Sequence, residues 1–149
     1  MDIEIDQSIR IKDSGDTVLA FSNGERVAIV LTGNLKRRAE RLLKAQYRTA
    51  KNHELKIFSA GLFPLLKDHL DSNLNIVIDT EWPDERSQAS IKGMLLNYIR
   101  TVVPGFHKDQ IAFRQIGKKS GAHKLAYAVH KRRDKKPFEV EEGELLSLL

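Results

Sequence analysis

The sequence predicts a single α/β domain, in which an antiparallel three-stranded meander is followed by parallel β-α units and helices cover both faces of a mixed sheet. Two observations predict this class: three short strand patterns within residues 3–31, and helical periodicity alternating with strand-like segments from residue 34 onward. A chain of 149 residues can build one good core but not two. We therefore expect one domain over residues 1–136 and an acidic, then apolar, C-terminal tail over residues 137–149.

The three N-terminal strands are predicted by alternation and by turn signals. Residues 3–11 alternate isoleucine with polar residues, which is the period-two pattern of a strand. A turn by composition at residues 13–16 leads to a second strand at 17–22. Asn23-Gly24 is a strong hairpin signal, and it leads to a third strand at 26–31.

Helices and strands then alternate along the chain. Asn34 is expected to cap a first helix, whose apolar residues recur at helical spacing. Residues 55–59 are predicted as a short strand, and residues 62–70 as a short helix with Pro64 in its first turn. The remaining elements are expected to be a buried apolar strand at 75–79, a helix within 83–103, a strand at 111–116 and a final helix from Ser120 to about residue 132.

Composition narrows the classes of protein and partner. The net charge is +5, and residues 118–136 hold eight basic residues against one acidic residue. This excess of positive charge favours DNA or RNA as a partner, because basic residues that neutralise phosphates release counterions. The alternative interpretation is a lysine-rich surface that is simply solvated. The absence of cysteine excludes disulfides and cysteine-ligated zinc. The longest aliphatic run covers only residues 27–31 and the N-terminus is acidic, so we expect a soluble, cytoplasmic protein without membrane contact.

Four polar side chains are candidates for a catalytic site at the carboxyl ends of the strands. Asp6 lies in the first strand, Asp79 ends the buried apolar strand, Glu81 follows two residues later, and His123 lies in the first turn of the last helix. Carboxylates from different strands are the ligands that hard divalent cations need. We expect Asp6, Asp79 and Glu81 to hold Mg²⁺ or Mn²⁺, which in pairs supports phosphodiester cleavage, and His123 to assist.

These residues resemble those of a known fold family. The order of elements, Asp6 in Ile-Glu-Ile-Asp, Asp79 in Ile-Val-Ile-Asp, and His123-Lys-Leu-Ala are similar to ribonuclease H-like nucleases, particularly Holliday-junction resolvases of the bacterial Ruv type. The resemblance implies a ribonuclease H-like fold over residues 1–135 and a metal-dependent nuclease. The chain departs from the family in three ways: no glycine soon follows Asp6, the central acid comes one β-α unit later, and histidine replaces aspartate in the last helix.

Each candidate also has a simpler interpretation. Asp6 shares its predicted strand face with a row of polar residues, Asp79 precedes a loop that it can cap, and His123 can be a surface or capping residue. Three hypotheses therefore remain: a metal-dependent nuclease, a non-catalytic nucleic-acid-binding or assembly module on the same scaffold, and an unrelated α/β protein with a structural role. The nuclease hypothesis requires Asp6 and Asp79 to lie on the same face of the sheet, beside His123.

Two basic segments are candidates for contacting nucleic-acid phosphates. One stripe of the first helix, at helical spacing and without acidic residues, either tracks a phosphate backbone or is an ordinary wet helix face. The loop at 117–121 joins a strand to a helix and favours an anion, although it lacks the spacing of a nucleotide-binding P-loop. The nucleic-acid-binding candidates are Arg37, Arg41, Lys44 and Arg48 in the stripe, and Lys118, Lys119 and Ser120 in the loop.

The C-terminal tail combines four glutamates with a final Leu-Leu-Ser-Leu-Leu sequence. Such a segment can fold back on the basic body, dock into the groove of a protein partner, or remain disordered.

Overall fold

The computed structural model describes residues 2–23, 25–46, 53–79, 82–116, 120–131 and 139–149. These residues contain a five-stranded mixed sheet in the order β3-β2-β1-β4-β5. Strands β1 (Asp2–Gln7), β2 (Thr17–Ser22) and β3 (Arg26–Leu31) are antiparallel neighbours, whereas β4 (Asn75–Asp79) and β5 (Ile111–Arg114) run parallel to β1. The predicted α/β class, the meander and the parallel second half of the sheet are confirmed.

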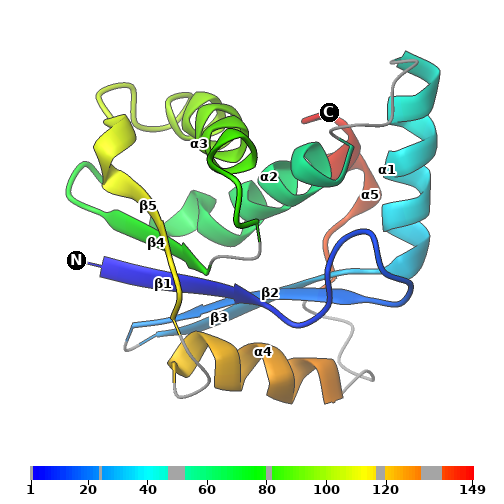
Figure 1. Cartoon of the computed structure of the whole chain (residues 1–149), viewed down its shortest axis with the longest axis horizontal. Helices are drawn as coiled ribbons and strands as arrows, with labels where there is room; N and C mark the ends of the chain where they lie inside the picture. The colour runs from blue at the N-terminus through cyan, green and yellow to red at the C-terminus, as the bar shows by residue number, and fades with distance from the viewer. Residues whose placement is uncertain (1, 24, 47–52, 80–81, 117–119, 132–138) are drawn as a thin grey trace.

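Helices cover both faces of this sheet (Figure 1). Helices α1 (Gly33–Gln46), α2 (His53–Leu66) and α3 (Glu85–Ile99) lie on one face, and α4 (Gly121–Lys131) lies alone on the other. The short α5 (Glu142–Leu146) packs against α1 and α2, and 3₁₀ turns cover Lys67–His69 and Lys108–Gln110. Among the described residues, none of the helices has both the length and the apolar character needed to cross a bilayer.

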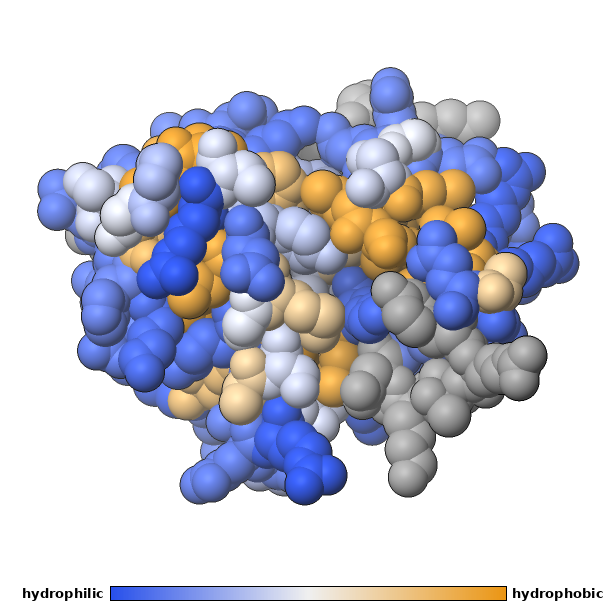
Figure 2. Space-filling model, turned by 90° about the horizontal axis from the view of Figure 1, so that it is seen from above, coloured by the Kyte–Doolittle hydropathy of each residue, from blue (hydrophilic) through white to orange (hydrophobic). Residues whose placement is uncertain are grey.

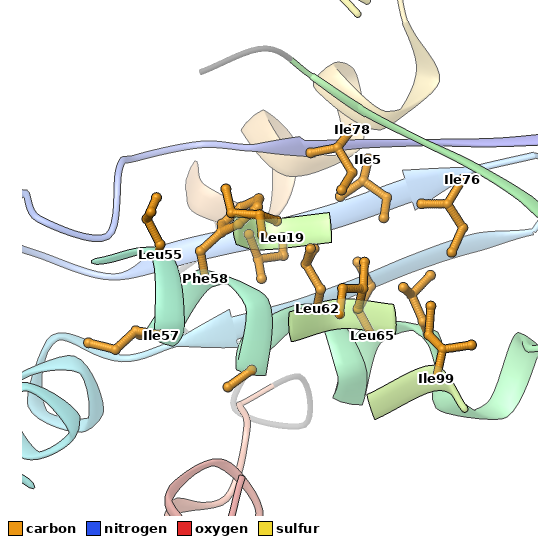
Figure 3. Packing of buried hydrophobic residues seen from close by; sticks show 14 of the residues in the cluster. Ile5, Leu19, Leu55, Ile57, Phe58, Leu62, Leu65, Ile76, Ile78 and Ile99 are labelled. Atoms are coloured by element: carbon orange, nitrogen blue, oxygen red, sulfur yellow. The ribbon is translucent and has the colours of Figure 1, made fainter. Parts of the chain in front are cut away.

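The two faces carry cores of different size. The α1–α3 face holds the larger core, in which α2 side chains such as Phe58 and Leu62 pack on Ile5, Leu19 and Ile78 (Figure 3). The α4 face has a small cluster, which consists of Val18, Ala20, Ala28, Val30, Leu125 and Ala126. On the molecular surface over α1–α3, apolar residues form a patch that is bordered by hydrophilic residues (Figure 2).

The predicted strand at residues 55–59 is wrong, because these residues belong to α2. Leu55, Phe58, Leu62 and Leu65 recur at helical spacing and are all buried, and the Ser59 hydroxyl donates to the Leu55 carbonyl within the helix. The helix is buried on nearly every side, so it shows no polar face that reveals its period in the sequence. Consequently Pro64 lies near the end of α2 rather than in a first turn, and β4 directly follows this helical region as the fourth strand.

Several element ends also differ from the predictions. β1 ends at Gln7 instead of residue 11, because Ser8 turns its hydroxyl to accept the backbone N–H of Val18 at 3.0 Å. β5 ends at Arg114 instead of residue 116. Helix α1 is capped by Thr32, whose hydroxyl accepts the backbone N–H of Leu35, and not by Asn34.

The tail folds back on the domain. The backbone N–H of Val140 donates to the Val30 carbonyl at 2.9 Å, so the tail covers the edge of β3. Leu145 is fully buried in the larger core, and the Tyr98 hydroxyl donates to the Leu148 carbonyl at 2.8 Å. Two surface ion pairs, Arg38–Glu142 and Lys67–Glu144, complete the contact. Of the three expectations for the tail, folding back is the arrangement observed in residues 139–149, and docking into a partner stays a prediction.

Candidate functional site

Asp6 is the centre of the candidate site. It lies near the carboxyl end of β1, opposite Ala20 of β2, which belongs to the cluster under α4. Ile3 and Ile5 point into the larger core, so Asp6 points to the α4 face by strand alternation. Only 4% of Asp6 is exposed. The interpretation of Asp6 as one of a row of solvated side chains is therefore wrong.

Asp6 and His123 form a direct hydrogen bond. The Nδ1 atom of His123 lies 2.8 Å from Oδ2 of Asp6, and the backbone N–H of Gln7 donates to Oδ1 at 2.8 Å. A carboxylate only accepts hydrogen bonds, so an ionised Asp6 requires the proton on Nδ1 of His123. This contact leaves Nε2 of a neutral ring as the nitrogen that can bind a metal ion or accept a proton.

Asp79 lies beside Asp6 on the neighbouring strand. β4 is parallel to β1 with Ile5 opposite Ile78, and both isoleucines belong to the larger core. The next residue on each strand, Asp6 and Asp79, therefore points to the α4 face. The two aspartates thus share a face of the sheet, and opposite faces, which would reject the nuclease hypothesis, are excluded. Asp79 also accepts the backbone N–H of Ile116 at 3.0 Å through Oδ1, so it orders the segment after β5 as well.

The surroundings of Asp6 shift its pKa in opposite directions. Burial raises the pKa of Asp6, whereas the hydrogen bonds from His123 and from the Gln7 N–H act to lower it. The negative charge of Asp79 raises the pKa of Asp6 further. The buried Asp6 and the half-buried Asp79 together favour either a proton or a cation between them.

Small residues bring α4 close enough for His123 to reach Asp6. A side chain at Gly121 would bring its Cβ within 3.0 Å of Ser22, and Ala122 and Ala126 are buried on β1 and β2. The Ser120 hydroxyl accepts the backbone N–H of Ala122, which caps the helix. Ser120 is therefore placed as a helix cap, and its predicted phosphate contact is not tested. One turn past Ala126, His130 lies 3.5 Å from the Ser8 hydroxyl.

The remaining predicted site residues fall into two groups. Glu81, Arg48, Lys118 and Lys119 lie outside the described residues. Arg37, Arg41 and Lys44 are exposed on α1, on the other face of the sheet from Asp6, so the structure does not bring them to the candidate site. Across the described ranges, the structure contains no group of three or more His, Asp or Glu side chains that could hold a metal ion.

Sequence reasoning missed one charged residue close to the site. Arg114 of β5 is the register partner of Asp79, and its guanidinium lies 3.9 Å from Glu4 of β1. Strand alternation places Arg114 on the α4 face with the two aspartates. The sequence offered a usable signal here, because Arg114 is the only basic residue in the predicted strand at 111–116.

The described fold and site define an α/β protein with an aspartate–histidine pair and a second aspartate at the carboxyl ends of two parallel strands. Comparison of the chain with family models, with curated proteins and with solved structures finds no match. The functional argument therefore depends on the geometry of the site itself.

Proposed function

We propose that the chain is a ribonuclease H-like protein that cleaves nucleic-acid phosphodiester bonds with the help of a divalent metal ion. The carrying observation is the hydrogen bond between Asp6 and His123, with Asp79 on the same face of the adjacent parallel strand. Carboxylates at the ends of neighbouring parallel strands lie where ligands bind in α/β sheets.

The order of the strands supports the ribonuclease H-like assignment. The resemblance predicted an acidic residue on the first strand, another on a central strand, and a polar residue in the last helix. The predicted strand at 55–59 placed Asp79 one β-α unit later than the central acid of the resolvases. Because residues 55–59 are helical, this extra unit is absent and Asp79 ends the fourth strand, as the resemblance implies. The sheet order β3-β2-β1-β4-β5 then makes the strands of Asp6 and Asp79 direct neighbours.

The chemistry of the side chains fits a hard cation. Asp6 and Asp79 would hold Mg²⁺ or Mn²⁺ through carboxylate oxygens, which are the ligands these ions prefer, and Glu81 is the expected third ligand. The fit rests on the placement of two carboxylates on one face of adjacent parallel strands, where a cation would relieve their repulsion; the negative charge of Asp79 correspondingly raises the pKa of Asp6. When bound, such an ion supplies charge stabilisation and an activated water molecule.

His123 is suited to moving a proton in this reaction. Asp6 fixes the ring through Nδ1, and 40% of the His123 side chain is exposed, so water and substrate can reach the ring. An imidazole held by a carboxylate in this way acts as a base through its other nitrogen.

A non-catalytic nucleic-acid-binding module on the same scaffold is the second candidate. The specific observation in its favour is that both oxygens of Asp6 already accept hydrogen bonds, from Gln7 and His123. In this case the aspartates stabilise the packing of α4, and the basic residues provide the affinity. Replacing Arg41 and Lys44 with glutamine is then expected to flatten the log–log salt dependence of binding by about 1 to 2 units.

Replacing Asp79 with asparagine tests the nuclease proposal. The amide keeps the oxygen that accepts the Ile116 N–H, so Asp79→Asn preserves the fold while removing the charge that a hard cation needs. We expect wild-type protein to cleave at least one of branched DNA, RNA–DNA hybrid or single-stranded substrates with Mg²⁺ or Mn²⁺, and Asp79→Asn to be inactive.

Asp109→Asn is the matched control, because the Asp109 side chain is 79% exposed and lies outside the site. It should cleave like wild type. If wild-type protein is inert on the whole panel but binds these nucleic acids, the enzyme proposal fails and the second candidate replaces it.

A further inference from the structure

A charged pocket lies on the opposite face of the sheet from the Asp6–His123 site. It has a volume of about 660 Å³ and is formed by residues 11–15, α1 and the start of α2. Binding sites for small molecules commonly have volumes of roughly 300–1,000 Å³. Ile11 and Ile57 supply apolar walls, and the other walls carry charged side chains. The pocket is therefore large enough for a nucleotide-sized ligand.

Lys36 provides a buried cation in the wall of this pocket. Only 5% of Lys36 is exposed, and its Nζ donates to the Asp13 carbonyl at 2.8 Å and to the Thr17 hydroxyl at 3.0 Å. An ammonium group has three N–H donors, so these two bonds leave one for a ligand. Burial lowers the pKa of Lys36, which is the expected effect of taking an ammonium group out of water.

Arg37, Arg41 and Lys44 add positive charge along the same wall. They follow one another at spacings of four and three residues on α1, where like charges repel each other. An anion between these side chains removes the repulsion and accepts their N–H groups.

Five basic residues line the pocket against three carboxylates, those of Asp13, Glu40 and Glu54, and the last two lie near cations or histidine. Oε1 of Glu54 lies 3.6 Å from Nε of Arg10, and neither atom has a hydrogen-bond partner among the described residues. Oε1 of Glu40 lies 3.1 Å from Nδ1 of His53 and 3.8 Å from Nζ of Lys44. Among the described residues, neither Arg41 nor Lys12 of this pocket has an ion-pair partner within 4.0 Å. The pocket therefore keeps an excess of positive charge.

His53 supplies a polar atom without a partner. Only 3% of His53 is exposed, and its Nε2 has no hydrogen-bond partner among the described residues. The Glu40 carboxylate on Nδ1 makes the Nε2 of a neutral ring an acceptor. A ligand hydroxyl satisfies this acceptor when the His53 ring, which lines the pocket, turns the buried Nε2 toward it.

We propose that this pocket binds a phosphate monoester on a ribose, with Lys36, Arg37 and Arg41 contacting the phosphate and His53 accepting a ribose hydroxyl. A free nucleotide and the 5′-phosphorylated end of an RNA strand share this chemistry. The site is independent of the proposed nuclease activity, because its residues lie on the other face of the sheet.

Calorimetric titration of the full-length protein in EDTA tests the proposal, since chelation keeps RNA probes intact. The probes are AMP, 2′,3′-dideoxy-AMP, and one RNA hexamer with either a 5′-phosphate or a 5′-hydroxyl. We expect AMP to bind and the dideoxy analogue to bind at least about threefold more weakly, because it lacks the hydroxyls that His53 would contact. An affinity for AMP alone identifies a free nucleotide as the ligand, and a preference of about tenfold for the 5′-phosphorylated hexamer identifies a strand end.

The double variant R37Q/R41Q is expected to weaken AMP binding by about tenfold or more, since two charge-assisted contacts are lost. R86Q/K108Q is the matched control, because it removes the same charge from exposed positions outside the pocket. R41Q alone, at an exposed position, serves if the double variant unfolds. No binding of AMP at millimolar concentration, or equal weakening by R86Q/K108Q, overturns the proposal. Equal binding of AMP and its dideoxy analogue overturns the role of His53.

Discussion

The two faces of the sheet are packed in different ways. On the α1–α3 face, large side chains from three helices fill the space over the sheet, and Phe58 packs against Trp82 with ring centroids 4.4 Å apart and ring planes tilted by 58°. On the α4 face, the contact of one helix with the sheet is made mostly by alanine, valine and a single leucine. The small side chains bring α4 close to the strands, and at the edge of this contact lie Asp6 and His123.

The α1–α3 face therefore contributes most of the stability, whereas the proposed catalytic site lies on the α4 face. Burial of apolar surface is the main stabilising contribution to folding, so most of it comes from the α1–α3 face. A close contact of small residues contributes less, but it holds a helix at a fixed distance from β1, which a short hydrogen bond between Asp6 and His123 requires. The comparison predicts that substitutions on the first face change the free energy of unfolding, whereas substitutions at the edge of the second change activity.

The largest effect on stability is expected for Phe58→Ala. Phe58 is 2% exposed and its removal leaves a cavity beneath Trp82, so we expect a loss of about 3–5 kcal/mol in the free energy of unfolding. Leu125→Ala, on the α4 face, is the matched truncation and should cost about 2 kcal/mol, because Leu125 is 8% exposed at the border of a small cluster. Urea unfolding followed by circular dichroism measures both. An equal cost for the two variants contradicts the division between the faces.

His123→Ala is expected to affect activity far more than stability. It removes the ring that would move a proton, yet water can reach the position it leaves because the side chain is 40% exposed. We therefore expect cleavage on the most active substrate to be lost, with a destabilisation of about 1 kcal/mol. A loss of more than about 2 kcal/mol, the range of core or buried-network residues, shows that the role of His123 is structural.

The sequence predicted the strands that carry the site better than the helices that cover the core. Turn signals and alternation located β1, β2 and β3, and the apolar run before Asp79 located β4, because each pattern lies within a few neighbouring residues. Helix α2 was predicted only in its second part, within a helix at 62–70, because a helix buried on nearly all sides has no amphipathic period. Its Leu55–Ser59 segment resembles an apolar strand for the same reason.

The site was predictable in part. The placement of Asp6, Asp79 and His123 on one face could be predicted, because strand ends and helix starts are where ligand-binding side chains occur. The pocket lined by Lys36 and His53 was not found, because burial of a lysine and a histidine depends on how residues 11–15, α1 and α2 meet in space. The sequence around Lys36 or His53 contains no local pattern that predicts this packing of residues 11–15 with α1 and α2.

The next, smaller effect on the free energy of unfolding is expected from Lys36, and it depends on pH. Burial is the main cause that lowers its pKa, and Arg37 adds to it, whereas Asp16 and Asp13 act in the opposite direction. Between the lowered pKa and the usual value of 10.5, the unfolded chain binds the proton that the folded chain releases, so stability rises with pH in this window. Unfolding by urea at a series of alkaline pH values should show this rise in the difference in free energy of unfolding between wild type and Lys36→Met. Taking this difference removes the opposing contributions of Tyr98, whose pKa is raised by burial, and of Lys67, whose pKa is raised by its hydrogen bond with Glu144. A difference that stays constant across this pH window contradicts the assignment.

The smallest effect is expected at the ion pair that joins the tail to the domain. Lys67 and Glu144 lie at the surface, with side chains 37% and 36% exposed, where solvent and salt screen their attraction. Glu144→Gln should therefore lower the free energy of unfolding by less than about 0.5 kcal/mol, and 0.5 M salt, on the order of a 4 Å screening length, should abolish the difference. Leu145→Ala is the comparison within the same helix, because Leu145 is fully buried in the large core and its truncation should cost about 2–4 kcal/mol. A larger loss for Glu144→Gln than for Leu145→Ala would mean that charge, rather than the α1–α3 core, holds the tail in place.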